Sequence, residues 1–179
     1  MSDKPRHPAI DLPEEDRIDY LTAVASIAWA DRFTHEAEVL RLREMCAALA
    51  LAGPAVERVV GAAYPPAPDS LARILAACRK RGLQYALLTD ATVIAFADGR
   101  VDSGEAGEIA RFARELGLTT ALAVLVGRYV EEVVHHSPTD ALSKDLAGQL
   151  AALGAPVPQQ GVVRGLFGRL RHRAAAPPG

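Results

Sequence analysis

Aromatic residues are scarce in this sequence, at 5% of the chain, although half of its residues are hydrophobic. Alanine and leucine fill most of the hydrophobic positions, and these residues favour helices, whereas strands are enriched in β-branched and aromatic residues. A chain of 179 residues is also long enough to bury a core without metals or disulfides to cross-link it. We therefore predict an all-α globular protein.

Cysteine is almost absent, with only Cys46 and Cys78, each in an apolar, helix-like stretch. Neither has CxxC spacing or a neighbouring histidine, so both are predicted to be core residues and not parts of a disulfide scaffold. No uncharged apolar run approaches the roughly 18–20 residues of a membrane-spanning helix. The N-terminus also lacks the apolar region and cleavage site of a secretory signal, which makes a cytoplasmic location our expectation.

Catalytic signatures are missing too. The sequence holds no HExxH helix, no glycine-rich phosphate loop and no recognisable Ser/His/Asp set. His135 and His136 are adjacent near a predicted helix end, and adjacent helical residues point about 100° apart, so a structural role is predicted for both. These absences favour a non-enzymatic protein.

Acidic residues outnumber basic ones outside the C-terminal tail. The formal net charge is −2, and because residues 161–179 hold four arginines and no acid, residues 1–160 carry −6. Binding to nucleic-acid phosphates requires a basic face on the folded domain. We therefore expect no nucleic-acid partner.

The composition divides the chain into four segments. Residues 1–13 contain three prolines and are expected to be a flexible lead-in, 14–153 a helical domain, 154–161 a linker and 162–179 a tail. Asp69 or Ser70 is predicted to cap one helix, and Thr119 or Thr120 another. Hydrophobic periodicity predicts helices over these residues: 14–30, 34–49, 54–62, 71–80, 83–97, 103–116, 119–136 and 137–153.

An internal repeat emerges when the chain is shifted by 67 positions without a gap. Alanine-rich sequence produces apolar matches easily, so the two acidic matches carry the most weight. The repeat predicts a helix, acidic loop and helix unit that is used twice. The shift superposes these pairs: Leu21 on Leu88, Ile27 on Ile94, Asp31 on Asp98, Glu38 on Glu105 and Leu49 on Leu116.

Residues 98–105 form the more complete of the two acidic loops. Asp98 and Gly99 predict a turn, while Asp102 as N-cap and Glu105 three residues later predict a capping box. The alternative is a divalent cation site, because Ca²⁺ and Mg²⁺ take carboxylate and carbonyl oxygens from short turns. The loop lacks the EF-hand spacing, and the residues alone leave both interpretations open.

Residues 97–105, with the apolar helix before them and 113–118 after them, resemble the tellurite-resistance TerB family and the related N-terminal domain of DjlA-type co-chaperones. The likeness extends over roughly residues 14–153. It implies a compact bundle of about seven or more helices with internal pseudo-symmetry. It also implies no catalysis, a metal site shared by the two halves, and a stress-response role near the inner membrane with protein partners. Carried over by position, the ligands of a divalent cation of the Ca²⁺ or Mg²⁺ class would be Asp31, Glu38, Asp98, Asp102 and Glu105.

The first copy departs from this pattern. Arg32 stands where the second copy has the turn glycine, and its guanidinium could pair with Asp31 and cancel charge that a cation needs. His35 could add a nitrogen ligand, although a histidine at an exposed helix start is more often solvated.

The tail is basic and amphipathic over residues 162–173. If it is helical, Val163, Leu166, Phe167 and Leu170 share one face, which suits an anionic membrane surface or a groove on a protein partner. Residues 166–171 also resemble the cargo-loading peptides of encapsulin nanocompartments. A disordered, solubilising tail is the alternative.

Overall fold

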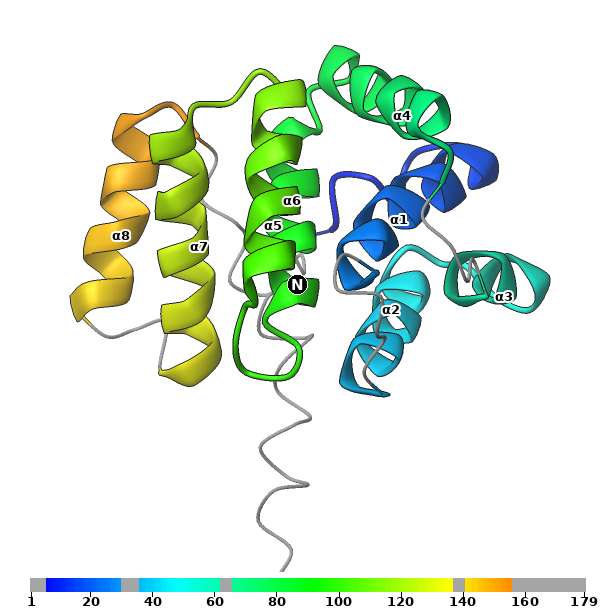
Figure 1. Cartoon of the computed structure of the whole chain (residues 1–179), viewed down its shortest axis with the longest axis horizontal. Helices are drawn as coiled ribbons and strands as arrows, with labels where there is room; N and C mark the ends of the chain where they lie inside the picture. The colour runs from blue at the N-terminus through cyan, green and yellow to red at the C-terminus, as the bar shows by residue number, and fades with distance from the viewer. Residues whose placement is uncertain (1–5, 30–35, 62–65, 137–140, 156–179) are drawn as a thin grey trace, which may run out of the picture.

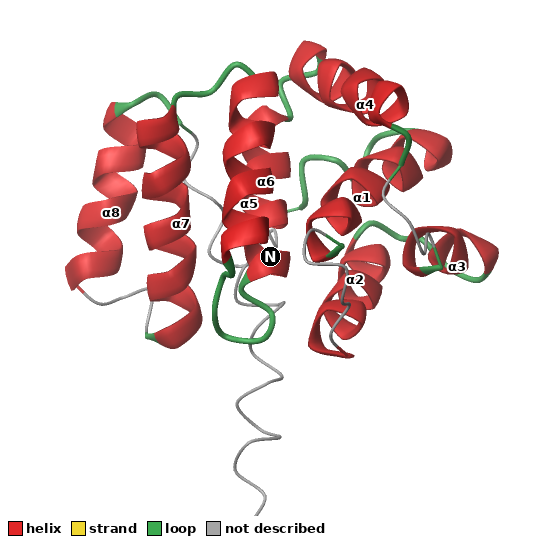
Figure 2. Cartoon of the chain, viewed as in Figure 1, coloured by secondary structure: helices red, strands yellow, loops and turns green. Residues whose placement is uncertain are grey.

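The computed structural model describes residues 6–29, 36–61, 66–136 and 141–155, and within these ranges it holds eight helices and no strand (Figures 1 and 2). The predicted all-α bundle is therefore confirmed. None of these helices is long and apolar enough to cross a bilayer. The helices are α1 (Glu14–Ala28), α2 (Glu36–Ala48), α3 (Pro54–Val60), α4 (Pro68–Lys80), α5 (Gln84–Ala95), α6 (Ser103–Glu115), α7 (Thr120–His135) and α8 (Ala141–Ala152).

The centre of the bundle is the packing of α1 against α5, while α7 and α8 lie side by side at one end (Figure 1). Residues 87–95 of α5 are all buried, as expected for a helix that is apolar on every side. Small side chains line both helices, including Ala23 and Ala28 of α1 and Ala91 and Ala95 of α5, each at most 2% exposed. Their size lets the two helix backbones approach closely.

The repeat predicted from the sequence is present in the fold. A shift of 67 residues carries the bounds of α2 onto those of α6, and α1 onto a range that contains α5. The contacts are reciprocal as well, because α1 packs on α6 and α5 packs on α2. Reciprocal contacts of this kind are those of an isologous, two-fold-related pair. The two halves therefore pack against one another like the subunits of a dimer.

Both halves end their second helix with the same backbone turn. Ala50 has φ 53° and its repeat equivalent Gly117 has φ 74°. In each half the next amide, that of Leu51 or Leu118, donates back to a helix carbonyl at 2.8 Å, as in a Schellman motif. The left-handed conformation costs a residue with a Cβ roughly 1–2 kcal/mol. The fold thus imposes this turn on the first half although glycine is absent there.

The predicted N-caps of two helices can be compared with the structure. Thr119 caps α7, since its hydroxyl oxygen accepts from the amide of Leu122 at 3.2 Å. The caps predicted at Asp69 and Ser70 were wrong, because α4 already begins at Pro68. Proline suits the first helical position, where its fixed φ fits and no amide hydrogen is needed. The starts predicted at Thr34 and Ser137 lie outside the described residues, as does the tail from residue 156 onward.

Residues 6–13, which we call the strap, are packed on the bundle where the sequence suggested a flexible lead-in. Ala9 is fully buried, and Ile10 and Leu12 are partly buried against the core. Two turn hydrogen bonds shape the strap, from Ile10 N to His7 O at 3.0 Å and from Leu12 N to Ala9 O at 3.3 Å. The prolines suggest a loose segment, but the apolar side chains between them pack against the core and hold the strap in place.

Candidate functional site

The acidic loop adopts the predicted capping geometry. The carboxylate of Asp102 accepts from the amide of Glu105 at 2.9 Å, and the carboxylate of Glu105 accepts from the amide of Asp102 at 2.9 Å. Asp98 and Gly99 form the turn, with Gly99 at φ 98° and an Asp98 oxygen accepting from the amide of Arg100 at 3.1 Å. The capping box therefore fixes the Glu105 side chain at the start of α6.

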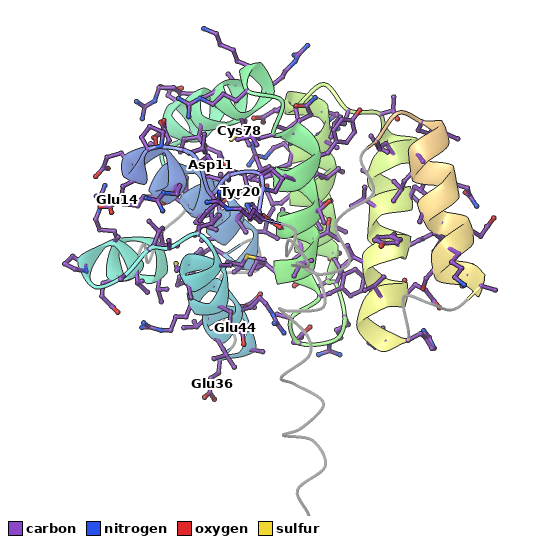
Figure 3. The ribbon with its side chains drawn as sticks, turned by 180° about the vertical axis from the view of Figure 1, so that it is seen from behind. Asp11, Glu14, Tyr20, Glu36, Glu44 and Cys78 are labelled. Carbon is purple, nitrogen blue, oxygen red and sulfur yellow. The ribbon has the colours of Figure 1, made fainter. Side chains whose placement is uncertain are left out.

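The structure brings Glu105 into contact with Glu38, its equivalent in the repeat. The two side chains are 7% and 4% exposed and are hydrogen-bonded to each other. A two-fold axis brings a residue against its own counterpart only where that residue lies near the axis. Glu36, in the same turn of α2 as Glu38, lies at the outer end of the helix and points away from the bundle (Figure 3). The buried carboxyl pair thus joins the two halves.

Burial raises the pKa of the Glu105 carboxyl to about 7. The hydrogen bond from the Asp102 amide opposes this rise, whereas the charges of Asp102 and Glu38 and the hydrogen bond to Glu38 add to it. Two carboxyl groups in contact cannot both ionise without strong repulsion, so they tend to share a proton. Near neutral pH Glu105 therefore titrates, and a cation would compete there with a proton.

Of the other expected ligands, the described residues bring only Asp102 to the Glu38 and Glu105 pair. Asp98 faces its own loop, where its carboxylate also lies 3.8 Å from the guanidinium of Arg100. Asp31, together with Arg32 and His35, lies outside the described residues. Within the described ranges, no group of three or more His, Cys, Asp or Glu side chains is arranged to hold a metal ion. These ranges therefore supply a carboxyl pair with Asp102 beside it, and not a full coordination shell.

The two halves differ in charge one turn beyond the pair. In α2, Arg41 is buried and forms an ion pair with Glu44, whereas in α6 the order is inverted and Glu108 pairs with Arg111. Burial lowers the pKa of the Arg41 guanidinium. Residues three apart on a helix are neighbours, so Arg41 lies on the same face of α2 as Glu38. The first half thus has a buried base, paired with Glu44, at the position where the second half has an acid.

A second buried cluster was not foreseen from the sequence. One oxygen of Asp90, on α5, accepts from the Tyr20 hydroxyl of α1 at 2.6 Å and is 2.8 Å from Nε2 of His7 in the strap. The amide of Ala9 donates to Nδ1 of His7 at 3.1 Å, which leaves the hydrogen on Nε2 to point at Asp90. The side chains of His7 and Asp90 are only 8% and 6% exposed. Three polar side chains are therefore satisfied inside an apolar core.

Asp90 also affects how its partners titrate. Burial lowers the pKa of His7, but the hydrogen bond to Asp90 and the charge of Asp90 outweigh it, so the pKa is raised. Burial and then the charge of Asp90 raise the pKa of Tyr20 well above its ordinary value. The sequence signal for this cluster is an acid within the otherwise uncharged run of residues 86–97, because a buried acid needs a partner.

Comparison with known proteins gave no match, whether with family models, with curated proteins or with solved structures.

Proposed function

We propose that this chain is a non-enzymatic, TerB-like helical module of the tellurite-resistance type, which binds a divalent cation of the Ca²⁺ or Mg²⁺ class and acts in a stress response. Glu38 and Glu105 would provide the central ligands, with Asp102 beside them and Asp31 and Asp98 completing the expected set. Carboxylate oxygens are the donors that such hard cations prefer.

The contact between Glu38 and Glu105 is the observation that carries this proposal. Glu38 in the first turn of α2 and Glu105 in the first turn of α6, 67 positions apart, meet inside the bundle, where ionised carboxyl groups are costly. A bound cation would neutralise both carboxylates and displace the proton that they otherwise share. Two ionised carboxylates side by side lower the stability of the fold when no cation is bound. Cation binding would account for why the fold holds them together.

Titration with Ca²⁺, Mg²⁺, Mn²⁺ and Zn²⁺ at about pH 8, where the proton competes least, tests the proposal. A cation at ten times its Kd stabilises the native state by about 1.4 kcal/mol. For a chain of this length that is a rise in melting temperature of roughly 3–5 °C, measured by circular dichroism.

A Glu105→Gln variant keeps an acceptor for the capping box but loses the ligand charge, so its melting temperature should not respond to the cation. Glu36→Gln is the matched control, because it removes an exposed acid from the first turn of α2 and should leave the response intact. No shift with any of the four ions, or an equal shift in Glu105→Gln, would contradict cation binding at this pair.

A second candidate function is that of an adaptor whose basic tail docks onto a protein partner or peripherally onto the inner membrane. It is favoured by the four arginines and the apolar face that the sequence places in residues 162–173. We expect the full chain to sediment with vesicles that contain anionic lipid, and a chain ending at Gln160 to stay in the supernatant. Equal sedimentation of the two chains would count against the adaptor function.

A further inference from the structure

The two halves of the repeat provide an internal comparison for the cluster around Asp90. The position equivalent to Asp90 in the first half is Ala23, and the position equivalent to Tyr20 in the second half is Leu87. Ala23 and Leu87 are both fully buried. Each copy of the repeat thus has an apolar residue where the other has a polar one, so the hydroxyl from the first half and the acid from the second are not part of the shared pattern.

His7 supplies the polar attachment of the strap. Its ring is fixed from both sides, by the Ala9 amide on Nδ1 and by Asp90 on Nε2, and it packs edge-on against Tyr20 with the ring centres 5.7 Å apart. The other charged residues of the strap, Arg6 and Asp11, pair with each other at the surface and are 68% and 78% exposed. A single buried histidine thus carries the specific part of the docking.

The strap also forms one wall of a shallow pocket. Leu12 lines it together with Tyr20 of α1, Ile74 and Cys78 of α4, and Leu83 just before α5, and the charged residues Asp16, Asp19 and Arg81 line it as well. Figure 3 shows Tyr20 and Cys78 near Asp11 of the strap. Cys78 is 5% exposed. If the strap left, the pocket would lose a wall and the apolar surface between α1, α4 and α5 would open.

We propose that the strap is an intramolecular ligand with its own opening equilibrium: His7 docks it onto Asp90 and Tyr20, and its release uncovers the groove between α1, α4 and α5. The strap then covers this groove at a place separate from the carboxyl pair. Segments that bury little apolar surface open at a lower free energy than the whole domain unfolds, and the strap contributes only Ala9, Ile10 and Leu12 to the core.

The two cysteines allow a direct test in the full chain. Cys78 borders the groove, whereas Cys46 is fully buried in the core and reports global unfolding. Alkylation by iodoacetamide is followed at each thiol by mass spectrometry, in the native chain and in a His7→Ala variant. We expect about a tenfold faster reaction at Cys78, which corresponds to about 1.4 kcal/mol of lost docking, and no change at Cys46.

Arg6→Ala is the matched control, because Arg6 belongs to the strap but its pair is exposed. Its Cys78 should react at nearly the native rate. As a second measurement, the amides of Ile10 and Leu12 should exchange faster in His7→Ala while amides of α5 do not. The proposal is overturned if Cys78 is unaffected by His7→Ala, if Cys46 accelerates by the same factor, or if Arg6→Ala acts as strongly as His7→Ala.

Discussion

An Asp90→Ala variant is expected to unfold at a free energy about 3 kcal/mol below that of the native chain. The substitution leaves the hydroxyl of Tyr20 and Nε2 of His7 as buried donors with no acceptor at the Asp90 position. An unsatisfied buried donor costs about 1–3 kcal/mol, and the cost is partly offset because the carboxylate no longer has to be desolvated. Urea denaturation at neutral pH measures the difference.

A double-mutant cycle with Tyr20→Leu separates the hydrogen bond from packing. Leucine and alanine are the residues that the repeat places at the equivalent positions, Leu87 and Ala23, so the double variant copies a combination that this fold already accepts. We expect Tyr20→Leu to cost about 1–2 kcal/mol less in the Asp90→Ala background than in the native chain. Strict additivity would mean that Tyr20 and Asp90 are not energetically coupled.

The stability of the native chain should fall by about 2 kcal/mol between pH 5 and pH 8.5 when no divalent cation is present. The folded-state pKa of Glu105 is raised to about 7, above its ordinary value of 4.5. A group whose pKa is raised on folding binds its proton more tightly in the folded state. Its contribution to the free energy of unfolding is therefore complete at pH values below the unfolded-state pKa. The contribution is lost as the pH rises through about 7. The urea midpoint, measured in chelator across this range, reports the loss.

Glu105→Gln should make this pH profile shallower, leaving the contribution of His7, whose raised pKa acts in the same direction. Its amide oxygen can still accept from the Asp102 amide, so the helix start is preserved while the titrating group is removed. The variant is therefore expected to be about 2 kcal/mol more stable than the native chain at pH 8.5 and nearly equal to it at pH 5. The exposed Glu36→Gln should leave the slope unchanged, and a native profile that rises with pH would contradict the upward shift.

The sequence predicted most of the helical architecture because the signals for it are local. Hydrophobic periodicity located the helices, and the 67-residue repeat predicted the correspondence of α2 with α6. The capping box at Asp102 and Glu105 followed from side-chain chemistry within four residues. The start of α4 differs from the prediction because Pro68 fits the first helical position, which places Asp69 and Ser70 inside the helix and not at its N-cap.

The candidate site was predictable only in part. The repeat, and the shared site that the TerB resemblance implies, pair Asp31 with Asp98 and Glu38 with Glu105 without favouring either pair. The contact between Glu38 and Glu105, however, depends on how the two halves pack, which no local pattern encodes. The cluster of His7, Tyr20 and Asp90 joins residues up to 83 positions apart and has no motif. The composition of the strap instead suggested flexibility. Its prolines can be read from the sequence, whereas the burial of its apolar side chains depends on the fold.

The reciprocal packing of the two halves has a consequence for how this protein can vary. In a symmetric homodimer every substitution occurs twice, so a buried acid introduced beside the axis of one subunit must be tolerated in the other. Here both units belong to one chain, and each position can change alone. Tyr20 of the first half pairs with Asp90 of the second, while the equivalent positions, Leu87 and Ala23, stay apolar. The two halves share a backbone fold, and because they belong to one chain, each can acquire a different function.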